Sequence, residues 1–227
     1  MEHILDNPIW NALLSGNKHF SNGSQTVKYF DREVSPFVAF DKNKSENFQA
    51  LYDLIPHNNP VLFVTPQKIE IPAIWKVLQF IPGLQMVYDD SIKLADLEFE
   101  PMPLTIAHIS QMLELTKLTK PGPFDIRTNE FGHYRGFFDG DKLVAMTGQR
   151  LNPLPYAEVS AVCTHPDYLG RGYAKQLLLY HLHRIKAAGQ IPFLHVRDDN
   201  ERAIKVYESL GFKTRIAVYF YVLQKNS

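Results

Sequence analysis

Apolar positions recur every three or four residues over three segments of the second half of the chain, which predicts three helices at 105–119, 171–188 and 200–210. The first begins at a capping Thr105 and faces four side chains inward: Ile106, Ile109, Met112 and Leu113. Gly189 and Gly211 follow the other two segments, as glycine commonly does where a helix ends.

Strands are predicted where the period changes to two or where a short apolar run is bounded by turn residues. In the second half these segments are 97–100, 156–164, 192–196 and 215–223. Asp139-Gly140 interrupts the segment 133–151 and predicts a β-hairpin there. Helices and strands therefore alternate through this half, as in an α/β domain.

The first half gives a similar but weaker pattern. It predicts helices at 6–16, 45–55 and 72–81, and strands at 26–30, 36–40, 61–65 and 84–88. Pro72 opens the third of these helices. Because the stretch 89–103 is polar and irregular, we expect a smaller α/β N-terminal domain at 1–94 and a second domain at 95–227.

Charge and cysteine content narrow the classes of function. The 227 residues include 24 Lys or Arg and 24 Asp or Glu, so the formal charge is zero. This balance argues against nucleic-acid or membrane-surface binding, which normally needs a basic excess. The single cysteine, Cys163, cannot form an internal disulfide, and no signal peptide or membrane span is recognisable, so a cytoplasmic location is expected.

One junction carries a chemical signal. The strand ending at Thr164 leads through Gly170 and Gly172 into the helix that follows. Free N–H groups and a positive dipole at a helix start, approached through glycines without Cβ atoms, form an anion site suited to a pyrophosphate. A simple tight turn remains the alternative.

The residues around this junction resemble a known family. "EVSAVCTHPDYLGRGYAKQLL" followed by "NERAIKVYESLGF" resembles the GNAT superfamily of acyl-CoA-dependent N-acyltransferases, over about residues 95–225. The family's loop reads Arg/Gln-x-x-Gly-x-Gly/Ala; Gly172 and Ala174 match it, whereas Leu169 departs from it. The resemblance implies a mixed, strongly curved sheet with helices on both faces, acetyl-CoA or another acyl-CoA as co-substrate, no metal, and direct attack of an amine on the thioester.

The resemblance also implies roles for individual residues. Glu158 and Tyr207 are the catalytic candidates, Glu158 as the base for the amine and Tyr207 as the acid for the departing thiolate. The residues expected to contact the cofactor are Val162, Cys163, Thr164, Leu169, Gly170, Arg171, Gly172, Tyr173, Ala174, Asn200, Ala203 and Tyr207. Asn200 and Tyr207 are seven positions apart, on one helix face. Three bland alternatives stay open: a salt-bridged Glu158, an Asn200 that caps the helix, and a Tyr207 that belongs to the core.

Other candidates are weaker. A covalent role for Cys163 is discounted because it is flanked by apolar residues in a strand. His195 is either near the cofactor cleft or a core histidine, and the core is favoured. His165 is interpreted as positional, and the histidines lack zinc-ligand spacing. Strict alternation along 156–164 places Glu158, Ser160, Val162 and Thr164 on one face and Val159, Ala161 and Cys163 on the other, a phase that a bulge would reverse.

The acceptor is the least determined part of the interpretation. The segment 121–138 is expected to cross the acceptor side, with Phe124, Phe131 and Tyr134 available to line it. Arg127 or Arg135 could hold a carboxylate there, but the favoured alternative is that they are solvated charges of a loop and a hairpin. A weaker resemblance to the glycine N-acyltransferase-like branch fits a primary amine of a small molecule or of an amino-acid-like molecule as the acceptor. A homodimer is compatible with the sequence. A non-catalytic acyl-CoA-binding module and a purely structural protein are the alternative functions.

Overall fold

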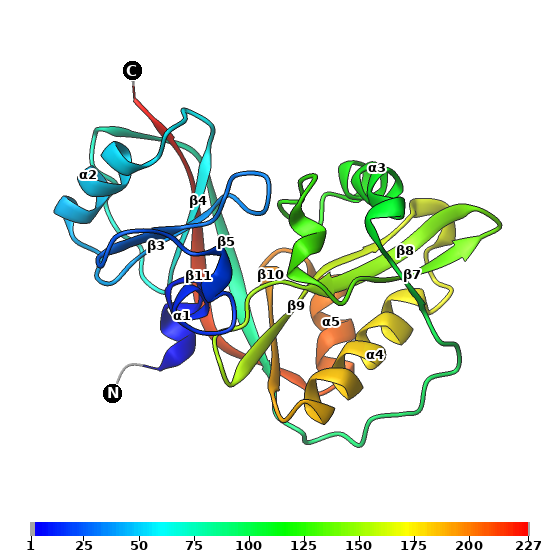
Figure 1. Cartoon of the computed structure of the whole chain (residues 1–227). Coiled ribbons are helices and arrows are strands. Elements are labelled where there is room, and N and C mark those ends of the chain that lie inside the picture. The colour runs from blue at the N-terminus through cyan, green and yellow to red at the C-terminus, as the bar shows by residue number, and fades with distance from the viewer. Residues whose placement is uncertain (1–2, 227) are drawn as a thin grey trace.

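One mixed sheet of eleven strands runs through the whole molecule, in the order β1-β2-β3-β4-β11-β5-β10-β9-β8-β7-β6 (Figure 1). The computed structural model describes residues 3–226. Two strands of fourteen residues, β5 (Trp75–Tyr88) and β11 (Phe212–Lys225), pair over almost their full length and belong to both halves of the molecule. The sheet therefore joins the halves instead of separating them.

The N-terminal half covers one end of this sheet with short elements. They are η1 (Ile4–Asp6), α1 (Pro8–Leu14), η2 (Lys18–Phe20), β1 (Asn22–Gly23), β2 (Val27–Tyr29), β3 (Phe37–Phe40), α2 (Ser45–Leu54) and β4 (Val61–Thr65). Pro8 occupies the first turn of α1, as predicted, although the Asn7 side chain makes no capping hydrogen bond. Four interlocked aromatic rings dominate the core of this half: Phe40, Phe48, Phe63 and Trp75.

The C-terminal half has helices on both faces of its strands (Figure 1). Its elements are β6 (Met102–Pro103), η3 (Ile106–His108), α3 (Ile109–Thr119), η4 (Thr128–Phe131), β7 (Arg135–Asp139), β8 (Lys142–Gln149), β9 (Tyr156–Thr164), η5 (Pro166–Tyr168), α4 (Tyr173–Ala187), β10 (Ile191–Arg197) and α5 (Glu201–Ser209). The predicted α/β class, with a mixed curved sheet and flanking helices, is confirmed. The hairpin at Asp139-Gly140 is also confirmed, with Gly140 at φ +56.

The predicted helix at 72–81 is wrong, because this segment is the first part of β5. Its place is fixed by pairing at long range: β5 lies between β10 and β11 and is antiparallel to both. The expected strand at 97–100 also does not form. In α3 the side that faces the core is Met112, Leu115 and Thr116, whereas Ile106 is 78% exposed.

The boundary at 94/95 stays a prediction, but the sheet crosses it. β5 belongs by sequence to the N-terminal segment and pairs with two strands of the C-terminal one. Within residues 3–226 no helix has the length and apolar character needed to cross a membrane. Over the same range, no group of three or more His, Cys, Asp or Glu side chains is placed to hold a metal ion.

Candidate active site

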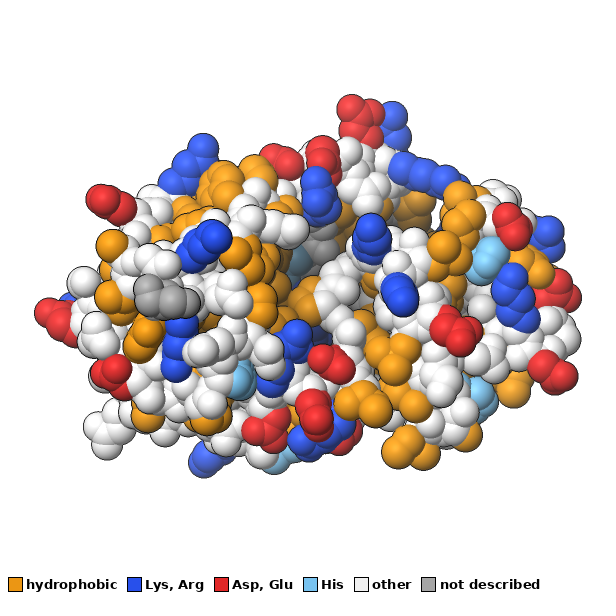
Figure 2. Space-filling model, turned by 90° about the horizontal axis from the view of Figure 1, so that it is seen from above, with side chains coloured by type: hydrophobic (Ala, Val, Ile, Leu, Met, Phe, Trp, Pro, Cys, Tyr) orange, Lys and Arg blue, Asp and Glu red, His pale blue; other side chains and the backbone are white. Residues whose placement is uncertain are grey.

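A cleft of about 970 Å³ lies where the two halves meet. Viewed from above, the surface is hollowed between the halves (Figure 2). β9, the glycine loop, α4 and α5 line one end, and residues of β3, β4, β5 and β11 line the other. All twelve residues expected at the cofactor line this cleft, whereas Glu158 does not.

The cleft opens because two neighbouring strands separate. β9 and β10 are parallel and pair only over Ile191–Phe193 and Tyr156–Glu158. Beyond that point β10 stays paired with β5, and β9 stays paired with β8. This separation of the two strands leaves Val159–Thr164 facing His195–Arg197 across the gap.

A bulge in β9 turns the main chain within the cleft. Ala161 has φ +52, and the register with β8 passes from Ser160 to Cys163 without pairing Ala161 or Val162. Val159 packs with the core under α4, whereas Ala161 and Cys163 pack with the core under α3. The strict alternation is therefore wrong beyond Ser160. Ala161 and Val162 have no ladder partner in β8 at this bulge.

The glycine loop presents main-chain amides to the cleft. Gly170 and Gly172 have φ values of +80 and +78, and a Cβ atom at either would meet no atom within 4 Å. The first hydrogen bond into the start of α4 runs from the Gln176 N–H to the Gly172 carbonyl. The N–H groups from Gly170 to Lys175 therefore remain available for a ligand. Arg171 stacks over the Tyr168 ring at 4.6 Å.

The start of α5 brings two predicted residues to the opposite wall. The Asn200 side-chain oxygen accepts a hydrogen bond from the Ala203 N–H at 3.2 Å, so Asn200 does cap the helix, and it also lines the cleft. Tyr207 is 8% exposed, and its ring contacts Phe212. Burial, with the nearby Cys163, raises the pKa of the Tyr207 phenol, which therefore keeps its proton at neutral pH.

Glu158 lies behind the cleft in a buried ion pair. It is fully buried, and Arg150 donates to both of its oxygens, from Nε at 2.8 Å and from Nη2 at 2.6 Å. The Leu151 N–H and His195 Nδ1 occupy the remaining positions, at 3.2 and 2.7 Å. Burial alone raises the pKa of Glu158, but Arg150 and His195 outweigh burial and lower the pKa to about 2.

This geometry does not support the expected role of Glu158 as direct base for the amine. A base that accepts an amine proton near neutral pH needs a pKa closer to that pH and must reach the proton. Glu158 meets neither condition, because its oxygens are occupied by protein donors. Of the alternatives considered from the sequence, the structure places Glu158 in the salt-bridged one.

His195 is the residue that sequence reasoning missed. It lines the cleft and contacts Glu158 through Nδ1, while its Nε2 lies 3.2 Å from the side-chain nitrogen of Gln85. Gln85 itself is anchored by the Leu5 carbonyl at 2.8 Å and by Arg215 at 2.9 Å. Its place depends on strand pairing: Phe193 pairs with Glu158, so His195, two positions on, projects from the same face of the sheet.

Cys163 and His165 have the minor roles expected of them. The Cys163 thiol is 3% exposed and donates to the Ala161 carbonyl at 3.1 Å. Burial raises the pKa of this thiol to about 12, so it is not a nucleophile at neutral pH. His165 accepts from the Asp167 N–H at 3.3 Å and caps η5.

The residues expected on the acceptor side lie elsewhere. Arg127 forms an exposed ion pair with Glu130, and Arg135 stacks over the Tyr180 ring at 4.7 Å. Neither lines the cleft, and neither do Phe124, Phe131 or Tyr134. Arg127 and Arg135 therefore agree with the alternative considered for them from the sequence, charged side chains outside the cleft. Of the segment 121–138, only Pro121, Gly122 and Pro123 line the cleft, together with residues of the N-terminal half.

Part of the chain resembles known proteins in sequence. A family model described as FR47-like protein matches residues 134–221. The N-alpha-acetyltransferase RimI of Mycobacterium tuberculosis is 38% identical over 85 residues, which are 36% of this chain and 52% of that protein. A mycothiol acetyltransferase of Nocardiopsis dassonvillei is 42% identical over 60 residues, 26% of this chain and 18% of that protein. The chain thus spans about half or less of these two curated relatives.

Solved structures resemble the whole chain. A protein of Novosphingobium aromaticivorans, provisionally described as an acetyltransferase of the GNAT family, is 31% identical with a TM-score of 0.91, and the match covers both chains completely. A GCN5-related N-acetyltransferase of Kribbella flavida has a TM-score of 0.60 at 15% identity, over 96% of this chain and 95% of that one. This second likeness shows the fold alone.

Proposed function

The chain belongs to the GNAT superfamily of N-acetyltransferases, and from this premise we propose that it transfers an acyl group, acetyl by preference, from acyl-CoA to the primary amine of a small molecule. A bond forms between the amine nitrogen and the acyl carbon, and the carbon–sulfur bond of the thioester breaks. The amine loses a proton and the thiolate gains one, so the site has to provide both a proton acceptor and a donor.

The observation that carries the proposal is the row of available amides from Gly170 to Lys175 at the start of α4. The space above Gly170 and Gly172 fits a phosphate group that approaches the backbone closely. These residues hold the pyrophosphate of CoA, and Asn200 and Ala203 lie along its pantetheine arm. The β9 bulge places a main-chain donor beside the thioester carbonyl, where it stabilises negative charge on the oxygen.

Tyr207 is the proton donor of the proposed mechanism. Its raised pKa keeps the phenol protonated at neutral pH, and its position on the cleft wall makes it available to the leaving sulfur. The phenol donates its proton as the carbon–sulfur bond breaks and recovers one from solvent afterwards.

His195 replaces Glu158 as the proposed proton acceptor, and Glu158 becomes a positioning residue. A carboxylate on Nδ1 keeps a proton at that nitrogen and leaves the Nε2 lone pair available, as in other histidine–carboxylate pairs. Gln85 competes for Nε2, at a cost of about 1 kcal/mol for one neutral hydrogen bond.

Calorimetric titration with acetyl-CoA and a CoA-release assay over a panel of amines test the proposal together. Binding accompanied by release with at least one amine supports it. Binding without release for any amine favours the alternative, a non-catalytic acyl-CoA-binding module. Absence of binding refutes the placement of CoA in this cleft. The names of the two curated relatives indicate different acceptors, so they do not select one for this chain.

A further inference from the structure

The described charged side chains that line the cleft are all positive. Among the described residues, 3–226, those that line it include seven Lys or Arg side chains and no Asp or Glu, although the whole chain is balanced. Four of these cations surround the glycine loop and the start of α5: Arg171, Lys175, Arg197 and Arg202. The phosphates of CoA explain them. The other three lie at the opposite end: Arg32, Lys120 and Arg150.

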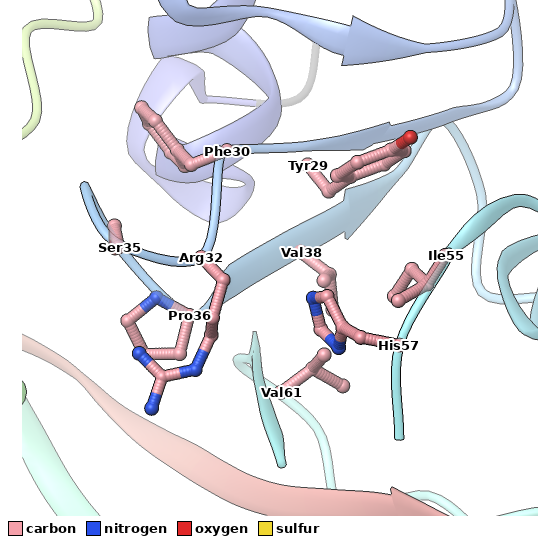
Figure 3. A pocket seen from close by; sticks show the side chains of 9 residues that line it. All are labelled: Tyr29, Phe30, Arg32, Ser35, Pro36, Val38, Ile55, His57 and Val61. Carbon is pink, nitrogen blue, oxygen red and sulfur yellow. The ribbon is translucent and has the colours of Figure 1, made fainter. Parts of the chain in front are cut away.

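Arg32 comes from the N-terminal half, is held by Asp125 of the C-terminal half and lines the cleft. It borders both the cleft and a small cavity of about 10 Å³ beside His57. Its terminal nitrogens point away from His57 (Figure 3). Nη1 forms a half-exposed ion pair with Asp125 at 3.0 Å, and Nε is buried without a hydrogen-bond partner. Nη2 forms no hydrogen bond within residues 3–226 and is not buried, so it is the donor that Arg32 can offer to a ligand.

Arg150 is oriented by its bidentate bond to Glu158. That bond engages Nε and Nη2 and leaves Nη1 available, close to Gly122 in the loop that follows α3. Because Glu158 neutralises most of the Arg150 charge, Arg150 contributes mainly a directed N–H donor. Lys120, exposed at the end of α3, adds a charge on the same side.

An apolar wall faces these cations. The guanidinium of Arg150 lies 4.7 Å from the centre of the Phe37 ring, and the His195 ring packs edge-on against Phe220 at 5.7 Å. Ile81 and Val222 complete the wall from β5 and β11. This end of the cleft thus combines hydrogen-bond donors for an anion with a surface for a hydrophobic group.

We propose that the acceptor is an apolar α-amino acid, whose carboxylate is held by Arg32 with help from Arg150 and Lys120, and whose side chain lies on the wall of Phe37 and Phe220. This inference rests on the proposed acyl transfer and names the substrate class of the same site. Cationic acceptors such as polyamines or lysine side chains are disfavoured, because the lining offers them repulsion and no carboxylate. The transfer yields the N-acyl amino acid and CoA.

Three matched acceptors separate the possibilities: L-phenylalanine, L-phenylalaninamide and phenethylamine. The first carries the carboxylate, the second imitates a peptide N-terminus, and the third has the ring and amine alone. We expect kcat/KM for the acid to exceed that for the amide by about tenfold or more, as expected for a charge-assisted hydrogen bond. Spermidine is included as the cationic acceptor, and we expect it to be the poorest substrate.

Two variants locate the carboxylate site. Arg32→Gln is expected to raise KM for phenylalanine by about tenfold or more, to leave KM for acetyl-CoA unchanged, and to leave phenethylamine unaffected. Arg127→Gln is the matched control, since Arg127 lies outside the cleft in an exposed ion pair. Equal preference for acid and amide in the wild type, or an unaltered preference in Arg32→Gln, overturns the inference.

A binding measurement keeps this inference separate from the proposed function. Calorimetric titration of the CoA-loaded protein with N-acetyl-L-phenylalanine and with its amide needs no turnover. Tighter binding of the acid by about tenfold, lost in Arg32→Gln, supports the anionic acceptor even if no amine is acetylated. Equal binding of the two compounds refutes it, even if acetyl transfer to another amine is found.

Discussion

The buried pair of Arg150 and Glu158 gives the sharpest stability prediction. Lowering the pKa of Glu158 from 4.5 to about 2 corresponds to about 3 kcal/mol of folding free energy. Glu158→Gln removes this contribution and leaves Arg150, which is 8% exposed, without its counter-charge. Losing one partner of a buried pair generally costs about 3–5 kcal/mol of folding free energy. The pKa shift and this general value therefore both predict that Glu158→Gln loses about 3 kcal/mol of stability at pH 7.

The pH dependence identifies the cause of that loss. Because the folded-state pKa is depressed, the stabilisation is complete above the unfolded pKa of 4.5 and is lost as the pH falls towards 2. At pH 3 we expect the wild type to keep about 1.4 kcal/mol of it, so the gap between wild type and Glu158→Gln narrows by about 2 kcal/mol. Other carboxylates titrate alike in both proteins and cancel in the difference.

Urea unfolding, followed by tryptophan fluorescence, measures the difference in free energy of unfolding between the wild type and Glu158→Gln at pH 7 and at pH 3. Glu201→Gln is the control, because Glu201 forms an exposed pair with Lys205 at 3.9 Å and we expect a loss below about 0.5 kcal/mol. The double variant Arg150→Gln/Glu158→Gln is expected to lose less than the two single variants combined. A loss below about 1 kcal/mol at pH 7, or equal gaps at both pH values, refutes the reasoning.

The remaining predictions concern the cleft. Tyr207→Phe should lower kcat by about tenfold to a hundredfold with little change in acetyl-CoA affinity, and unchanged turnover would remove Tyr207 from the mechanism. Gly172→Ala should weaken acetyl-CoA binding by calorimetry, because the residue holds φ +78 and its Cβ enters the phosphate space; wild-type affinity would contradict that placement. Cys163→Ala should retain activity, and the wild-type thiol, with its pKa raised to about 12, should resist iodoacetamide at pH 7; a trapped acyl-Cys163 would overturn this. His195→Gln should lower kcat by about a hundredfold with little change in acetyl-CoA affinity, whereas wild-type turnover would exclude His195 as the proton acceptor.

The local part of the site was predictable because its signals lie within short segments. The glycine loop, the start of α4 and the Asn200 to Tyr207 face of α5 each depend on spacing over a few residues, and the structure places all of them on the cleft. The alternatives left open for Asn200 and Tyr207 describe real features as well: one caps its helix and the other is largely buried.

Pairing at long range decided what the sequence could not. The segment 72–81 has apolar positions compatible with a helix, but from Trp75 onward it pairs with β11, which lies more than a hundred residues away in the chain. The role of Glu158 changed for the same reason. Residue type and position suggested a base, whereas its pKa depends on Arg150 and His195, which only the folded chain brings within hydrogen-bond distance.

The proposed acceptor end of the cleft is formed by residues that only the tertiary structure brings together. Arg32, Phe37 and Phe220 come from segments without a recognisable motif, and they meet because β5 and β11 carry the sheet from one half of the molecule into the other. Local periodicity and glycine placement determined the loop and helices proposed to bind CoA, since their geometry is set by neighbouring residues. The electrostatics of the proton path and the shape of the acceptor end arose from burial and strand pairing, which depend on residues distant in sequence.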